Sequence, residues 1–200
     1  MNATGTPGEY FERMYAGSAD PWGFETSWYE LRKYGLLVAA LPEERYRVCF
    51  EPACSIGVLT QMLAARCDEV HAVELVDAAA GRARERMARA GLDHVHVRTA
   101  DALEPWPRET CDLLVLSEFL YYTAAAGLDE RVTRLLDLAA PGATVVACHW
   151  LGRSADHACT GEEVHAVLGR RPELTRLVHH REAGDLQAGF LLEVFRLDGV

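Results

Sequence analysis

The sequence predicts an α/β fold: a single doubly wound domain with a mostly parallel, seven-stranded sheet, an antiparallel C-terminal strand and an N-terminal helical lid. Three observations predict it. The chain has 200 residues, of which 50% are hydrophobic, which is enough for one globular core. From residue 48 onward, apolar runs of strand length alternate with Ala-, Arg- and Leu-rich runs of helix length, as in βαβ units. The last two strand-like runs leave no room for a crossover helix between them and should pair antiparallel.

The expected elements follow in order along the chain. Seven runs have the apolar content and length of strands: 47–50, 69–73, 94–97, 112–116, 144–149, 174–179 and 190–195. Three runs between them have leucine and alanine at helical spacing: 58–66, 78–90 and 128–139. Gly91 is expected to stop the second of these helices, and Pro141-Gly142 the third. A further helix is expected to start at Thr160-Gly161-Glu162-Glu163.

The first 45 residues differ from the repeats, and we expect residues 46–200 to form the α/β domain without them. This N-terminal segment contains eight aromatic residues, at positions 10, 11, 15, 22, 24, 28, 29 and 34. Such a density of aromatic side chains predicts a segment that covers either the sheet edge or a ligand. The alternative is an extension that only packs on the core.

Composition and charge exclude several classes of protein. Thirty acidic and 20 basic residues give a formal charge of −10, which disfavours a nucleic-acid partner. The apolar runs are too short for a membrane helix. The first 15 residues lack the basic and apolar regions of a secretory signal, and the six cysteines form no CxxC pair. We therefore expect a cytoplasmic protein with buried thiols and no metal site, and leave the oligomeric state open.

The most informative stretch is residues 49–60, which connects the end of the first strand to a helix start. In a doubly wound sheet the ligand binds outside the carboxyl end of this strand. A dinucleotide fingerprint would require glycines at the positions of Ala53, Ser55 and Val58, and a Walker loop would require Gly-Lys-Ser/Thr. Because both patterns are missing, a nicotinamide-dependent oxidoreductase is disfavoured. The turn favours a ligand without phosphates, such as S-adenosylmethionine.

Carboxylates follow the next strands of the predicted sheet. Glu74 ends the second strand and could accept hydrogen bonds from both hydroxyls of a ribose. Asp101 follows the third strand and could accept one from the exocyclic amine of adenine. Glu118 follows the fourth, so all three should reach the same sheet edge. Taken alone, Glu74 could also be a solvated residue that ends a strand, and Asp101 is a weak signal.

At this point the sequence resembles the class I S-adenosylmethionine-dependent methyltransferases, which are Rossmann-like, and most closely their nodulation N-methyltransferase branch. The resemblance covers most of the chain. The residues that carry it are Asp20-Pro21-Trp22 with Tyr29-Glu30 and Lys33-Tyr34, then Glu51 to Thr60, Ser117 to Tyr122, Ala140-Pro141-Gly142 and Cys148-His149-Trp150. It implies S-adenosyl-L-methionine as the cofactor. It also implies a segment around Trp22 that closes over the cofactor, and a set of further cofactor-binding residues: Glu51, Ala53, Cys54, Ser55, Gly57, Glu74, Leu75, Asp101, Ala102 and Ser117.

The sequence departs from the family pattern in the loop after the first strand. Ala53 and Ser55 stand where glycines are common. A Cβ at Ala53 would be tolerated if its φ is negative. Lys33 is our candidate partner for the cofactor carboxylate, with Arg32 as the next choice and a solvated lysine as the alternative.

The resemblance implies methyl transfer to an amine of a small molecule, such as an amino sugar or a specialised metabolite. The transfer is an in-line displacement that depends on positioning and on exclusion of water. Glu118 and His149 are the candidate catalytic residues, because each could take or relay the proton of the amine. The alternatives are a cofactor-loop role for Glu118 and a core hydrogen bond for His149. O-methylation of a small molecule and a non-catalytic cofactor-binding module remain the alternative functions.

Overall fold

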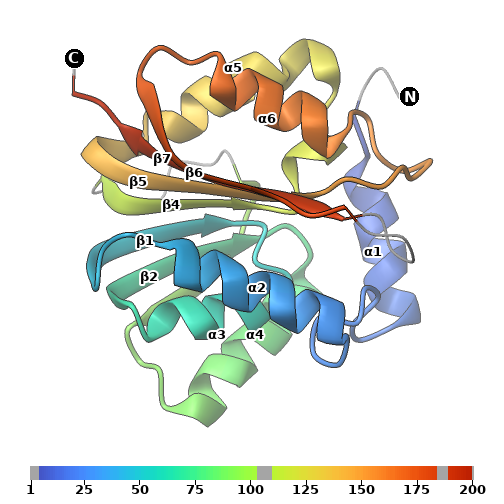
Figure 1. Cartoon of the computed structure of the whole chain (residues 1–200). Helices are drawn as coiled ribbons and strands as arrows, with labels where there is room; N and C mark the ends of the chain where they lie inside the picture. Colours follow the sequence, from blue (N-terminus) through green and yellow to red (C-terminus); the bar gives the residue numbers. More distant parts are fainter. Residues whose placement is uncertain (1–4, 103–109, 184–188, 200) are drawn as a thin grey trace. The chain divides into compact units, whose positions relative to one another are not determined.

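The computed structural model describes residues 5–102, 110–183 and 189–199, which form seven strands (Figure 1). The chain separates into two compact units, residues 7–109 and residues 1–6 with 110–200. The boundary between these units differs from the expected one after residue 45. The role of residues 1–45 as a lid stays a prediction.

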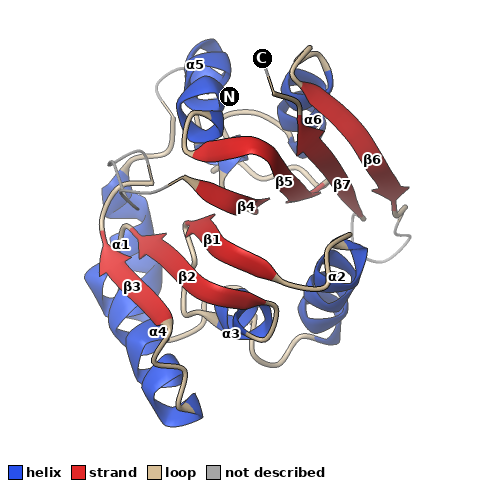
Figure 2. Cartoon of the chain, turned by 90° about the vertical axis from the view of Figure 1, so that its left-hand side faces the viewer, coloured by secondary structure: helices blue, strands red, loops and turns tan. Residues whose placement is uncertain are grey.

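Among the described residues, the N-terminal unit contains four helices and three parallel strands, in the order β3-β2-β1 (Figure 2). Its elements are α1 (Gly8–Gly17), α2 (Trp28–Ala40), β1 (Tyr46–Pro52), α3 (Val58–Ala64), β2 (Cys67–Glu74), α4 (Asp77–Ala90) and β3 (Val95–Thr99). In the register of these strands Glu51 pairs with Ala72, and Glu74 pairs with Thr99. Both glutamates therefore lie at the carboxyl ends of their strands, where a doubly wound sheet binds ligands.

Helix α4 shows why this unit folds as the sequence predicts. Its buried face consists of small residues and one methionine: Ala79, Ala80, Ala83 and Met87. Gly91 follows the helix with a φ of 67° and donates its N–H to the carbonyl of Ala88. The left-handed conformation favours glycine at such a helix end, so the expected stop is confirmed.

The C-terminal unit contains four strands in the order β4-β5-β7-β6 (Figure 2). Its elements are β4 (Cys111–Ser117), η1 (Leu120–Tyr122), α5 (Ala125–Leu136), β5 (Ala139–Trp150), α6 (Gly161–Gly169), β6 (Leu174–Arg181) and β7 (Phe190–Leu197). Strands β4 and β5 are parallel, whereas β7 is antiparallel to both β5 and β6. The predicted sheet class is confirmed, including the antiparallel C-terminal strand.

One predicted helix end is wrong. Helix α5 ends at Leu136, and Pro141-Gly142 lie within the first part of β5. The pairing of β4 with β5 shifts register here, from Cys111 opposite Ala139 to Leu113 opposite Thr144. Gly142 has a φ of 84°. A proline without an N–H and a left-handed glycine interrupt the strand ladder as a bulge does, so this signal marked an irregular strand rather than a helix end.

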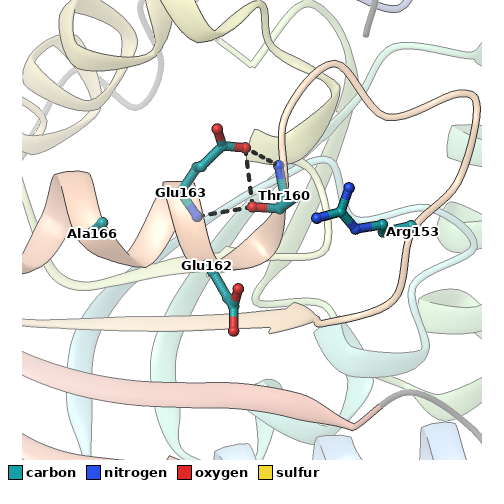
Figure 3. A pocket seen from close by; sticks show the side chains of 5 residues that line it. All are labelled: Arg153, Thr160, Glu162, Glu163 and Ala166. Atoms are coloured by element: carbon teal, nitrogen blue, oxygen red, sulfur yellow. Dashed lines mark hydrogen bonds between the residues drawn. The ribbon is translucent and has the colours of Figure 1, made fainter.

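Helix α6 begins where the sequence predicts it, at a capping box. The Thr160 hydroxyl accepts from the backbone N–H of Glu163 at 3.1 Å, and the Glu163 carboxylate accepts from the N–H of Thr160 at 2.7 Å (Figure 3). A pocket beside this turn is lined by Arg153, Thr160, Glu162, Glu163 and Ala166. It contains none of the predicted site residues. The helix packs against β5, β6 and β7.

Each of the six cysteines is buried and free of disulfide bonds, as expected. Among the described residues, no group of three or more His, Cys, Asp or Glu side chains could hold a metal ion. No helix in the described part of the chain is both long enough and apolar enough to cross a membrane.

Candidate functional site

The loop after β1 has an unusual backbone. Ala53, Ser55 and Gly57 all have positive φ angles, of 58°, 54° and 77°. The condition under which Ala53 would fit without strain, a negative φ, is therefore not met. A left-handed conformation costs a residue with a Cβ about 1–2 kcal/mol. The loop thus has a backbone shape that glycine adopts without strain, even though two of these three positions are not glycine.

Glu74 holds this loop in place. Its carboxylate accepts from the backbone N–H of Ser55 at 3.0 Å and from that of Val76 at 2.9 Å. The N–H of Cys54 donates to the carbonyl of Val73 at 2.9 Å. Burial raises the pKa of Glu74, and the hydrogen bonds from Val76 and Ser55 act in the opposite direction. The carboxylate predicted to hold the ribose therefore also positions the loop.

Glu51 is a buried carboxyl group at the start of the same loop. Its side chain is 3% exposed, and burial raises its pKa to about 8, while the nearby Thr60 hydroxyl acts in the opposite direction without forming a hydrogen bond to Oε2. Among the described residues its Oε2 atom has no hydrogen-bond partner. A buried polar atom of this kind is costly unless a ligand satisfies it. A cationic group such as an ammonium fits the position, because it would supply both hydrogen-bond donors and a compensating charge.

The N-terminal segment is attached to the loop through Tyr15. The Tyr15 hydroxyl and Ser55 Oγ are 2.6 Å apart, and Trp22 packs edge-on against Tyr15 with ring centroids 5.5 Å apart. Trp22 also stacks on Phe24, and Asp20 accepts from the backbone N–H groups of Phe24 and Glu25, both at 2.9 Å. Tyr15 was not among the predicted site residues. Its position in an aromatic-rich segment was the only signal in the sequence.

Lys33 is held by a neighbour on its own helix. It is 1% exposed, and its Nζ lies 2.7 Å from a carboxylate oxygen of Glu30. The ammonium also lies over the rings of Tyr29 and Tyr34, 5.3 and 5.6 Å from their centroids. This surrounding explains how a lysine is buried here. Its predicted contact with a cofactor carboxylate stays a prediction.

The residues predicted near the ribose and adenine lie after β2 and β3. Leu75 follows Glu74 and is 45% exposed. Asp101 is exposed and Ala102 is half-buried. The N–H of Ala100 donates to the carbonyl of Glu74 at 3.0 Å and joins the two strand ends. Residues 103–109, into which the predicted adenine segment continues, lie outside the described residues.

Glu118 follows β4 in the C-terminal unit and also has a positive φ, of 58°. Its carboxylate accepts from the hydroxyl of Tyr121 and from the backbone N–H of Trp150, the latter at 3.3 Å. Among the described residues, the non-glycine positions with positive φ are Ala53, Ser55 and Glu118. All three are predicted site residues. Backbone strain of this kind persists only where the surrounding structure enforces it, and it is concentrated at functional sites.

Aromatic and imidazole rings pack around Tyr121, whose hydroxyl donates to Glu118. Tyr121 stacks on His157 with centroids 4.0 Å apart and packs edge-on against His149 at 5.4 Å. His157 is buried; burial lowers its pKa, while Glu118 and Asp156 act to raise it. His157 was not a predicted site residue, because it follows β5 in a loop without a recognisable motif. Ser117, at the end of β4, is also buried, and among the described residues its Oγ has no hydrogen-bond partner.

His149 is fully buried on β5. Its Nδ1 lies 3.2 Å from Nε2 of His165, and Nδ1 of His165 lies 2.7 Å from Glu193. The alternative expectation, a histidine with a hydrogen bond in the core, is therefore correct for one of its nitrogens. That bond does not exclude a role for the other nitrogen, because a neutral imidazole has one donor and one acceptor.

The strain in the loop leads to a stability prediction. We expect Ala53→Gly to raise the free energy of unfolding by about 1 kcal/mol, because glycine adopts positive φ without a steric penalty. Ser55→Gly gains the same relief but loses the hydrogen bond between the Ser55 and Tyr15 hydroxyls, so its free energy of unfolding should stay close to that of the parent. The matched control is Ala78→Gly on the exposed side of α4, which should lower it by about 1 kcal/mol. Urea unfolding measures all three. A loss of stability in both loop variants would show that the loop is not strained.

The comparisons first establish the class of fold. The N-methyltransferase NodS from Bradyrhizobium japonicum, solved with S-adenosyl-L-homocysteine, superposes with a TM-score of 0.83 over 96% of this chain and 98% of that chain, at 24% identity. A candidate methyltransferase from Pseudomonas syringae is 35% identical, with a TM-score of 0.71 over 85% of this chain and 99% of that one. The fold is that of the Rossmann-like methyltransferases.

The sequence itself then identifies the family. The model of the nodulation protein S (NodS) family matches residues 9–183, and the chain belongs to this family. Nodulation protein S of Rhizobium tropici is 29% identical over 129 residues, which are 64% of this chain and 53% of that protein. The protein of Bradyrhizobium diazoefficiens is 28% identical over 142 residues, or 70% and 65%. The chain thus spans between about half and two thirds of the length of these curated relatives.

Proposed function

We propose that the protein is an S-adenosylmethionine-dependent methyltransferase that methylates an amine of a small molecule, with amino sugars as the first acceptors to test. Its family and a relative named as an N-methyltransferase and solved with S-adenosyl-L-homocysteine support this function. The observation that carries the proposal is the strained loop after β1, which begins at the buried carboxyl of Glu51 and is held by Glu74.

The residues of the N-terminal unit fit the cofactor by chemistry. Glu51 would bind the ammonium, because its Oε2 is buried and lacks a partner in the described structure. The backbone from Ala53 to Gly57 would line the methionine side, including Cys54 and Ser55. Glu74 would accept from the ribose hydroxyls, since each carboxylate oxygen has a second lone pair beyond its backbone bond.

The remaining predicted positions complete this part of the proposal. Leu75 would supply an apolar surface, and Asp101 with Ala102 would meet the adenine. Trp22 and Lys33 would act from the N-terminal segment, and Ser117 stays assigned to the cofactor. When bound, S-adenosylmethionine supplies an electrophilic methyl group on a sulfonium. The protein contributes position and exclusion of water.

Glu118 and His149 would handle the proton of the acceptor. An amine attacks only as the free base, and the methylated product is again an ammonium that must lose a proton. Both side chains lie in the C-terminal unit, and each contacts Tyr121. We also propose that the protein acts in the cytoplasm and without a nucleic-acid partner, in line with its acidic charge.

The acceptor assignment is tested with paired sugars. Purified protein and S-adenosylmethionine are incubated with glucosamine and its short oligomers, and in parallel with their N-acetylated forms. Mass spectrometry should show the gain of a methylene only on the free amines. A gain on both sets would move the assignment to O-methylation. Cofactor binding without any gain across a broad amine and hydroxyl panel would favour a non-catalytic module.

The lid prediction is tested at Trp22. We expect Trp22→Ala to raise the dissociation constant of S-adenosylhomocysteine about tenfold, because the variant loses the ring contacts with Tyr15 and Phe24 that order the segment. Trp28→Ala is the matched control, since that tryptophan is 75% exposed. Calorimetry compares the two. Equal dissociation constants would return the segment to a purely structural role.

A further inference from the structure

The candidate catalytic histidine, His149, and two further buried side chains form a continuous series of hydrogen bonds. His149 on β5 contacts His165 on α6 at 3.2 Å, and His165 contacts Glu193 on β7 at 2.7 Å. The three side chains are at most 4% exposed. Helix α6 lies over the β5 to β7 part of this unit (Figure 1). Neither His165 nor Glu193 was a predicted site residue.

Glu193 is held as a carboxylate. Burial alone would raise its pKa, but hydrogen bonds from His165, His179 and Arg176 together lower the pKa to about 2. Arg176 and His179 bind Oε1 at 2.7 and 2.8 Å, and His165 binds Oε2. The two Oε1 partners are about half exposed, so only the His165 side of the carboxylate lies entirely in the interior.

The carboxylate determines which nitrogen of each ring carries a proton. An ionised carboxylate only accepts hydrogen bonds, so His165 must carry its proton on Nδ1. In a neutral ring its Nε2 is then an acceptor, and the partner atom, Nδ1 of His149, must be the donor. A neutral His149 is therefore left with an unprotonated Nε2. This is the logic by which a buried carboxylate fixes the tautomer of a catalytic histidine.

We propose that His165 and Glu193 are positioning residues that keep Nε2 of His149 ready to accept the proton lost by the methylated amine. This inference rests on the proposed function. Nε2 of His149 takes the proton from the product ammonium, and the Nδ1 proton of His149 moves to Nε2 of His165. The positive charge then lies on His165, directly beside the Glu193 carboxylate. No proton is lost or gained within the three groups beyond the one taken from the product.

Other charged and titratable groups also face the hydrogen-bonded series His149–His165–Glu193. Tyr121 packs edge-on against His149 and connects it to Glu118 and His157 on one side. Arg176 and His179 from β6 face Glu193 on the other. The Arg176 guanidinium helps His165 and His179 to hold the pKa of Glu193 low.

The first test needs no turnover. Nitrogen-15 NMR of the histidine rings at pH 8 should show His149 and His165 both protonated on Nδ1, with assignments from His149→Gln and His165→Gln. In Glu193→Gln the pair should protonate at a pH lower by about one unit or more, because the carboxylate that stabilises the imidazolium is gone. Finding His149 protonated on Nε2 would overturn the proposal, as would an unchanged titration in Glu193→Gln.

The second test is kinetic. Glu193→Gln and His165→Phe should each lower kcat about ten- to a hundredfold without changing KM for S-adenosylmethionine. The acid limb of the kcat profile should move to lower pH in Glu193→Gln. His180→Gln, one residue beyond His179 on β6, is the matched control and should keep the parent kcat. We call His149, His165 and Glu193 the relay. An unchanged kcat in both Glu193→Gln and His165→Phe would contradict the proposal.

The two tests separate the relay from the proposed function. A His149 with Nε2 protonated overturns the relay even if the protein methylates amines. If the expected tautomers are found but no acceptor is methylated, the proposed function fails, and with it the catalytic use of the relay, while the assignment of the protons stands. Should His165→Phe not fold, Glu193→Gln and the spectra of the parent protein decide alone.

Discussion

Replacing Glu74 with alanine is expected to weaken the binding of S-adenosylhomocysteine by about 2–3 kcal/mol, or roughly a hundredfold. The carboxylate is proposed to accept from the ribose, and it already accepts from the backbone N–H groups of Ser55 and Val76. Its removal therefore deletes a ligand contact and frees a strained loop at the same time. Calorimetric titration measures the loss directly.

Two further variants make this result specific. Glu74→Gln keeps one acceptor oxygen and should give an intermediate loss. Glu69→Ala changes a carboxylate on the same strand that is 44% exposed and should bind like the parent protein. An unchanged dissociation constant in Glu74→Ala would show that this residue only ends a strand.

The second large effect is expected at Glu51, where binding and stability should change in opposite directions. The carboxyl has a pKa of about 8 in the folded protein and an ordinary value of 4.5. A raised pKa contributes stability that is fully present below pH 4.5 and is lost as the pH rises to 8. Glu51→Gln cannot ionise. It should therefore be more stable than the parent above pH 8. Its Tm should rise by about 2–4 °C for each kcal/mol gained in the free energy of unfolding.

Cofactor binding should change in the opposite direction to stability: it should strengthen in the parent protein as the pH rises, and it should be weaker in Glu51→Gln. A bound ammonium favours the ionised carboxylate, so below pH 8 binding must release the proton of Glu51. The affinity of the parent protein should then rise by up to about tenfold per pH unit between pH 6 and 8 and level off above. Glu51→Gln should bind weakly and without this pH dependence. A parent affinity that is flat over the same range would show that Glu51 does not meet the ammonium.

The fold followed from the sequence because its signals are local. Buried apolar runs predicted the strands, and Gly91 and the Thr160 capping box marked helix ends that the structure confirms. The helix end predicted at Pro141-Gly142 was wrong because this dipeptide is compatible both with a helix end and with an interrupted strand. Only the pairing of β5 with β4 distinguishes the two, and that pairing involves residues far apart in the sequence.

Part of the candidate site could be predicted from the sequence. Residues at strand ends, such as Glu51, Glu74 and Glu118, follow from the order of strands in a parallel sheet. Tyr15 and His157 belong to segments without periodicity, and His165 and Glu193 lie on a helix and a strand that looked like ordinary core elements. Their roles depend on side-chain contacts across 40 residues between Tyr15 and Ser55 and 28 between His165 and Glu193. Spacing along the chain does not encode such contacts.

The most direct test of the account is a calorimetric titration of the parent protein at pH 8.5 with S-adenosylmethionine, S-adenosylhomocysteine and, as the comparison ligand, NAD. The loop after β1 and the carboxylates at Glu51 and Glu74 predict binding of the first two at micromolar concentration or below, one molecule per chain, and no binding of NAD. Absence of binding by both sulfur ligands would contradict the account. The strained loop would then belong to a different ligand.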